Sequence, residues 1–112
     1  LLLADIFALP SRGLYETWGL AVNEAMHVGV PALVSTLVGC QQDLVTPGET
    51  GWVFPPGEPG ALQSALARAL ADVAAPGGRD RLRAGVLARI SRYTYTETTA
   101  GLDAALRSVV PP

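Results

Sequence analysis

The chain has 112 residues, 49% of them hydrophobic and 16% charged, and its formal net charge is −2 at pH 7. This composition is typical of one modest globular domain and excludes a disordered chain. All eight basic residues are arginines, and the balance of charge leaves no basic surface for nucleic acid or anionic lipid. Cys40 is the only cysteine, which excludes an internal disulfide and a zinc cluster within the chain.

The ends of the sequence and its apolar runs bear on location. The longest runs, such as 28–34, are too short to cross a bilayer, and no basic leader precedes Leu1. The chain does not begin with Met, and its single methionine, Met26, falls inside a predicted helix. We therefore expect a piece of a longer, cytoplasmic protein, which could associate peripherally with the inner face of the cell membrane.

The first third of the chain predicts a strand followed by a helix. Asp5–Leu9 is apolar on both faces, as a buried parallel strand usually is. After a polar turn, Thr17 or Trp18 opens a helix that runs to about Val28, and Gly29 is expected as its left-handed C-cap.

The rest of the chain predicts two more strands and three long helices. Turn residues separate these elements, and the last three show helical spacing of apolar side chains. The longest apolar stripe is Leu62, Leu66, Leu70 and Val73. The predicted elements are strand 31–35, a helical turn 41–45, strand 52–54, and helices 60–73, 79–93 and 97–110.

This order of elements favours an α/β fold, with a Rossmann-like parallel sheet and flanking helices in one partial domain, residues 1–112. Three strands make a thin sheet, and further strands are expected before Leu1. Such a sheet has an open edge and an uncovered apolar face. We therefore predict that the chain expressed alone associates with itself through that surface.

Two glutamates eight positions apart, Glu16 and Glu24, flank the start of the first helix. In open α/β sheets, ligands bind beyond the carboxyl ends of the strands, where such a strand-to-helix turn lies. Backbone amides at a helix start favour a phosphate, and a carboxylate further along can accept hydrogen bonds from sugar hydroxyls. The arrangement therefore suits a nucleotide-sugar.

The residues around these glutamates carry a family likeness. The pattern Glu16-x-Trp18-Gly19-Leu20, then Glu24-Ala-Met-x-x-Gly-x-Pro31, with Gly48-x-Thr-Gly51 further on, resembles the C-terminal donor-binding domain of family 4 retaining glycosyltransferases of the GT-B type. The likeness covers essentially all of the chain and implies the second half of that domain.

The resemblance implies a role for each residue of the motif. Glu16 would contact the hydroxyls of the transferred sugar and stabilise positive charge at its anomeric carbon. Glu24 would accept hydrogen bonds from the ribose hydroxyls, and no metal or cofactor would be required. The backbone amides that would face the diphosphate or sugar are those of Trp18, Gly19, Leu20 and Ala21.

The chain departs from the family pattern at Trp18, Ala21, Cys40 and Asp43, and it lacks two parts of the family's proteins. Trp18 stands where phenylalanine is common, and Cys40 stands where many relatives have a second glycine. The family's basic phosphate clamp and its N-terminal acceptor domain lie upstream and are not in this sequence. The resemblance therefore implies that this chain alone does not catalyse.

Each candidate residue also has a structural interpretation. Glu16 and Glu24 could be an ordinary acid at a helix start and an ordinary surface acid. They could also be the acid and nucleophile of a glycosidase, but this is disfavoured because the sequence shows no aromatic platform for a sugar. His27 is better explained as a packed or solvent-facing residue than as an acid or base. Arg12, in the loop before Glu16, could contact a phosphate or an acceptor. The five arginines between 79 and 92 could be a phosphate patch, but a solvated helix face explains them better.

The sequence therefore predicts part of a glycosyltransferase that transfers a hexosyl group, with retention, from a nucleotide-diphosphate sugar to an unknown acceptor. One alternative is a nucleotide-sugar epimerase of the same architecture. The other is a non-catalytic nucleotide-binding or interaction module. A preceding acceptor domain in the parent protein would favour the enzyme.

Overall fold

The computed structural model describes residues 3–13 and 17–111, and the fold is a three-stranded parallel sheet flanked by helices. The strands are β1 (Phe7–Leu9), β2 (Ala32–Ser35) and β3 (Gly51–Phe54), in the order β1-β2-β3. Phe7 pairs with Ala32, and Ala32 pairs in turn with Gly51. The prediction of a parallel α/β sheet is confirmed.

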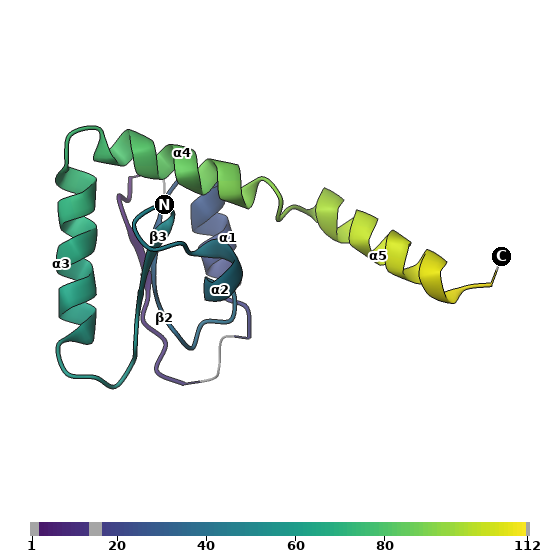
Figure 1. The fold of residues 1–112 in the computed structure, drawn as a ribbon, viewed down its shortest axis with the longest axis horizontal. Coiled ribbons are helices and arrows are strands. Elements are labelled where there is room, and N and C mark those ends of the chain that lie inside the picture. The colour runs from purple at the N-terminus through teal and green to yellow at the C-terminus, as the bar shows by residue number, and fades with distance from the viewer. Residues whose placement is uncertain (1–2, 14–16, 112) are drawn as a thin grey trace.

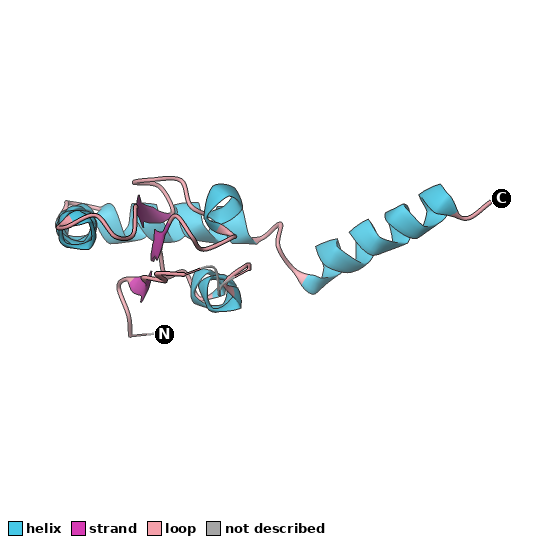
Figure 2. Cartoon of the chain, turned by 90° about the horizontal axis from the view of Figure 1, so that it is seen from below, coloured by secondary structure: helices cyan, strands magenta, loops and turns pink. Residues whose placement is uncertain are grey.

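Five helices connect and cover the strands. They are α1 (Leu20–His27), α2 (Gln41–Leu44), α3 (Ala61–Ala74), α4 (Gly78–Ile90) and α5 (Tyr95–Val109). Parallel neighbours need a crossover connection, and α1 supplies it between β1 and β2, whereas α2 and its loops supply it between β2 and β3. Figure 2 shows the strands between α3 on one side and α1 and α2 on the other.

The core has two parts, one on each face of the sheet. On the α1 face, Val22, Met26 and Val34 pack with Val86 of α4. On the α3 face, Trp52 and Leu33 pack with Ala69 and with Leu82 of α4. Helix α4 therefore closes both parts, and Figure 1 shows it lying across one end of the sheet.

Two predicted helix starts are wrong, for local reasons. Helix α1 begins at Leu20 and not at Thr17 or Trp18, because Gly19 takes a left-handed backbone conformation with φ = 93°. Helix α5 begins two residues earlier than predicted, because the side chain of Thr94 accepts a hydrogen bond from the amide of Glu97. Gly29, with φ = 82°, follows the end of α1 as predicted.

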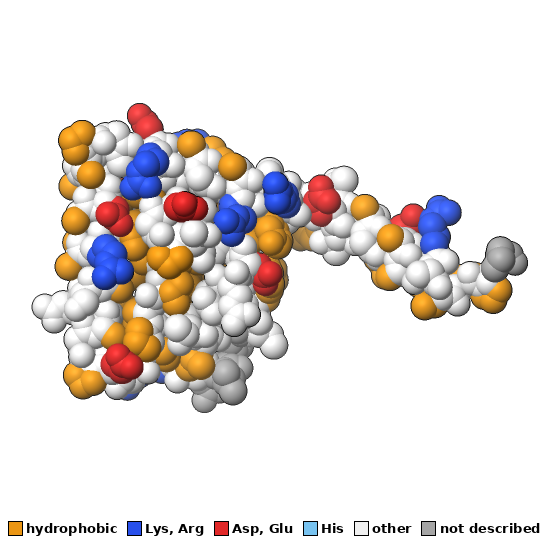
Figure 3. All heavy atoms as spheres, in the orientation of Figure 1, with side chains coloured by type: hydrophobic (Ala, Val, Ile, Leu, Met, Phe, Trp, Pro, Cys, Tyr) orange, Lys and Arg blue, Asp and Glu red, His pale blue; other side chains and the backbone are white. Residues whose placement is uncertain are grey.

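The predicted apolar stripe of α3 is present, but it does not form the packed face of the helix. Leu62, Leu66 and Leu70 are 40%, 40% and 55% exposed, whereas Ala69 is fully buried and Ala65 and Val73 are half-buried. Figure 3 shows exposed apolar side chains, in orange, along the edge of the molecule that α3 forms. Small side chains therefore bring α3 close to the sheet, and the leucines beside them face solvent.

Helix α5 leads away from the rest of the molecule (Figure 1). None of its described residues is buried, and its apolar side chains Leu102, Leu106 and Val109 are all more than half exposed. No helix in the described part of the chain has the length and apolar character needed to span a membrane.

Candidate functional site at the start of α1

The carboxyl ends of the strands lead into the loops that surround the start of α1. β1 leads through residues 10–19 into α1, and β2 leads into the loop 36–40. The two loops touch: the amide of Cys40 donates to the carbonyl oxygen of Trp18 at 2.9 Å. A Cβ on Gly39 would collide with the carbonyl oxygen of Thr17. This close approach fixes where α1 begins.

The first amides of α1 lack partners within the helix. Gly19 is the N-cap and supplies no side-chain oxygen, and the first turn contains no acidic residue. The amide of Val22 donates to the carbonyl of Gly19 at 2.9 Å, but the amides of Leu20 and Ala21 precede any carbonyl that the helix could offer them. Exposed amides at the positive end of a helix attract an anion.

The side chains of α1 divide into a buried and an outer set. Val22, Ala25 and Met26 are buried, whereas Leu20, Glu24 and His27 are exposed. Glu24 therefore presents its carboxylate to solvent one turn beyond the exposed amides. The ion pairs within residues 3–13 and 17–111 join Arg79 to Asp5 and Arg107 to Asp103, and neither involves Glu24.

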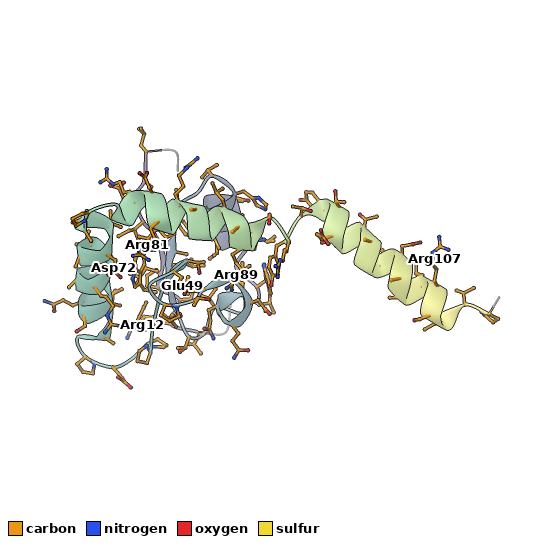
Figure 4. All side chains as sticks on the ribbon, turned by 45° about the horizontal axis from the view of Figure 1, so that its top comes forward. Arg12, Glu49, Asp72, Arg81, Arg89 and Arg107 are labelled. Atoms are coloured by element: carbon orange, nitrogen blue, oxygen red, sulfur yellow. The ribbon has the colours of Figure 1, made fainter. Side chains whose placement is uncertain are left out.

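Arg12 lies near a different element. It lines a pocket of about 390 Å³ with prolines and Glu58 of the β3–α3 loop and with Leu62 of α3. Figure 4 places Arg12 near the first turn of α3. The structure therefore brings together Trp18, Gly19, Leu20, Ala21 and Glu24, and places Arg12 beside the other face of the sheet.

Three comparisons with known proteins bear on this site. The family Glycosyl transferases group 1 matches residues 1–84. The chain belongs to this family. The family likeness and the fold that the sequence predicted are confirmed, since the solved structure of sucrose-phosphate synthase from Thermosynechococcus elongatus matches 96% of this chain with 34% identity and a TM-score of 0.67.

Two curated relatives are also similar to this chain. One is named as the colanic acid biosynthesis glycosyltransferase WcaL of Salmonella typhimurium, with 41% identity over 68 residues and 57% of this chain covered. The other is glycogen synthase of Bordetella bronchiseptica, with 32% identity and 94% of this chain covered. The chain spans 16% and 22% of the lengths of these two relatives and 26% of the sucrose-phosphate synthase chain.

One predicted site residue lies outside the residues that the structure describes, and the structure shows the surroundings of two others. Glu16, the predicted catalytic residue, lies outside the described residues. Cys40 is fully buried and packs in the core cluster that Trp18 partly covers. His27 is exposed, with its Nε2 3.4 Å from the carbonyl oxygen of Tyr93.

Arginines of α4 donate hydrogen bonds to backbone carbonyls of neighbouring segments, and Arg81 and Arg83 are exposed, as expected for a solvated helix face. Arg81 donates to the carbonyl of Gly48 at 2.7 Å, Arg83 to that of Val28 at 3.0 Å, and Arg89 to that of Asp43 at 2.9 Å. Figure 4 shows Arg81 and Arg89 near the loop that leads from α2 to β3. Sequence reasoning missed these contacts because a backbone carbonyl acceptor leaves no trace in the residue types.

Proposed function

We propose that this chain supplies part of the donor site of a glycosyltransferase that transfers a hexosyl group from a nucleotide-diphosphate sugar with retention. The observation that carries the proposal is the start of α1, where first-turn amides that have no carbonyl partner within the helix and the exposed Glu24 lie on one short helix. The amides of Leu20 and Ala21 would bind the diphosphate, together with those of Trp18 and Gly19. Glu24 would accept hydrogen bonds from the ribose.

The chemistry of transfer follows from the same geometry. When the sugar leaves the donor, negative charge grows on the diphosphate, and preorganised amides at a helix start stabilise that charge without rearrangement. Glu16 would face the sugar and stabilise the opposite charge at its anomeric carbon. With amides and cationic side chains neutralising the phosphates, the reaction would need no metal.

The acceptor and its binding surface belong to the rest of the proposed enzyme. The matched proteins are about four times as long as this chain, because segments that cover 57%, 94% and 96% of it make up only 16%, 22% and 26% of their lengths. We propose that an N-terminal acceptor domain of the same protein faces the start of α1 and that nucleic acid is not a partner. The net charge of −2 and the absence of lysine agree with that exclusion.

Nucleotide binding by the purified chain tests the proposal. Saturation-transfer NMR with UDP, GDP and ADP should show contacts to the ribose protons of at least one nucleotide, and Glu24→Ala should remove them. Glu58→Ala, on an exposed acid of the β3–α3 loop, is the matched control and should leave the contacts unchanged. A longer parent protein that binds none of the three nucleotides would refute the donor-site assignment.

Self-association is a second property that the open sheet favours. Among the described strands β1 pairs only with β2, so its other edge offers unpaired backbone groups. We propose that two copies of the chain associate through this edge. Light scattering should give a mass above 11.7 kDa that rises with concentration, whereas a monomer at every concentration would contradict the idea.

A further inference from the structure

Trp18 is held from three sides at the start of α1. Its indole Nε1–H donates to Oδ1 of Asn23 at 2.6 Å, and its carbonyl oxygen accepts from the amide of Cys40 at 2.9 Å. Its ring lies 6.3 Å, centroid to centroid, from the ring of Tyr93. These partners come from α1, from the loop after β2 and from the connection between α4 and α5.

The hydrogen bond from Trp18 to Asn23 joins the residue before the N-cap to the fourth residue of α1, and the N-cap itself, Gly19, makes no side-chain capping bond. Gly19 stands at the N-cap and offers no side chain, and the helix has only eight residues. Short helices fray at their ends unless tertiary contacts hold them. The indole of Trp18 instead reaches over Gly19 to the second turn of α1, next to Glu24.

We propose that Trp18 and Asn23 are positioning residues that hold the first-turn amides of α1 and the neighbouring Glu24 in the geometry that binds the donor nucleotide. This inference rests on the proposed function, because it names what orients that site. A phenylalanine at position 18 could fill similar space but could not donate to Asn23. The N–H group, and not the aromatic ring alone, is therefore the element to test.

The chain contains a matched indole hydrogen bond on the other face of the sheet. Nε1–H of Trp52 donates to Oδ2 of Asp72 at 2.7 Å, between β3 and α3. Trp52 is 2% exposed, whereas Trp18 is half-buried. Trp52→Phe removes the same type of bond from a more buried site, away from α1, so it separates loss of stability from loss of positioning.

The experiment measures nucleotide affinity and amide exchange on the folded 112-residue chain. Trp18→Phe and Asn23→Leu should each weaken binding of the best nucleotide among UDP, GDP and ADP by about three- to tenfold, the usual worth of one hydrogen bond. The affinity of the double variant should lie within about twofold of that of each single variant, because both substitutions remove the same hydrogen bond. Trp52→Phe should lower the melting temperature more and leave the affinity unchanged.

A second measurement needs no nucleotide. Asn23→Leu should shift the Trp18 indole N–H resonance and speed hydrogen exchange at the amides of Val22 and Glu24, with the Trp52 indole resonance unchanged. If exchange and affinity both stay at wild-type values in Asn23→Leu, the positioning role is refuted. If neither the wild-type chain nor a longer parent protein binds a nucleotide while exchange responds as described, the proposed function fails, and the role of the Trp18–Asn23 hydrogen bond in ordering α1 stands.

Discussion

On the α1 face of the sheet, side chains such as Met26 and Val34 fill the core. The two loops at the start of α1 touch through their backbones. On the α3 face, the helix approaches through alanines, and Trp52 is anchored to it by the carboxylate of Asp72. The α1 face therefore leaves its helix start open toward the carboxyl edge of the sheet. The α3 face hides its polar anchor and exposes leucines instead.

This difference separates two uses of the same fold. The α3 face holds its helix by close packing and by the partly buried hydrogen bond from Trp52 to Asp72, which serve stability. The α1 face holds its helix by loop contacts around an uncapped end, which leaves backbone donors available to a ligand. Changes on the α3 face should therefore affect unfolding, and changes at the start of α1 should affect binding.

The largest expected effect comes from removing the anchor of the α3 face. Trp52→Ala should lower the free energy of unfolding by about 3–5 kcal/mol, because it empties a buried site and leaves Asp72 without its donor. Urea denaturation followed by circular dichroism measures this loss. Trp18→Ala, at a half-buried site, should cost clearly less, and equal losses at the two tryptophans would remove the distinction between the faces.

The packing of α3 gives a paired prediction. Ala69→Leu should destabilise the chain by about 1–3 kcal/mol, because a fully buried alanine has no room for a larger side chain. Leu66→Gln, one turn away on the exposed row, should change the free energy of unfolding by less than about 0.5 kcal/mol. The reverse order in thermal or urea unfolding would mean that the leucine row is the packed face.

The contact between the loops of the α1 face can be tested at one atom. Gly39→Ala places a Cβ against the carbonyl oxygen of Thr17 and should cost about 1–3 kcal/mol while weakening nucleotide binding. Gly101→Ala, in α5 with no atom near the new Cβ, is the matched control and should be neutral or stabilising. A Gly39→Ala variant with wild-type stability and affinity would show that the loop contact does not fix the start of α1.

The sequence predicted the elements well where periodicity and turn residues agree. The strands around Ala8, Leu33 and Val53 and the end of α1 at Gly29 follow from apolar runs and from glycine, which act locally. The face of α3 was not predictable in this way. A row of leucines is the strongest periodic signal, but the distance between helix and sheet decides whether leucines or alanines face inward.

The candidate site was predictable only as a segment. Trp18 to Glu24 could be placed at a strand-to-helix turn from local pattern and family likeness, whereas the uncapped start at Gly19 depends on its left-handed φ and on Val38 packed beside it. Two of the partners of Trp18, Cys40 and Tyr93, lie far from it in the sequence, and no local rule connects residues so far apart. The same holds for the arginines of α4, whose acceptors are backbone carbonyls.

The smallest expected effect concerns how α4 holds the far end of α1. Nη1 of Arg83 donates to the carbonyl oxygen of Val28, where α1 ends and its carbonyls carry partial negative charge. Arg83→Ala should therefore cost about 1 kcal/mol. Arg107→Ala, which breaks an exposed pair with Asp103 one turn away in α5, should cost about 0.3–0.5 kcal/mol.

Salt distinguishes the two arginines further. Added salt screens the exposed pair of Arg107 and Asp103, so the cost of Arg107→Ala should fall toward zero in urea titrations at 1 M NaCl. The bond from Arg83 is directed at a carbonyl dipole, and the Arg83 side chain, guanidinium included, lies against Gly29, so the cost of its loss should persist. If the destabilisation caused by Arg83→Ala and that caused by Arg107→Ala both vanish at 1 M NaCl, then Arg83 acts only as a surface charge. In that case α1 is held by its own core residues and by the hydrogen bond from Trp18 to Asn23.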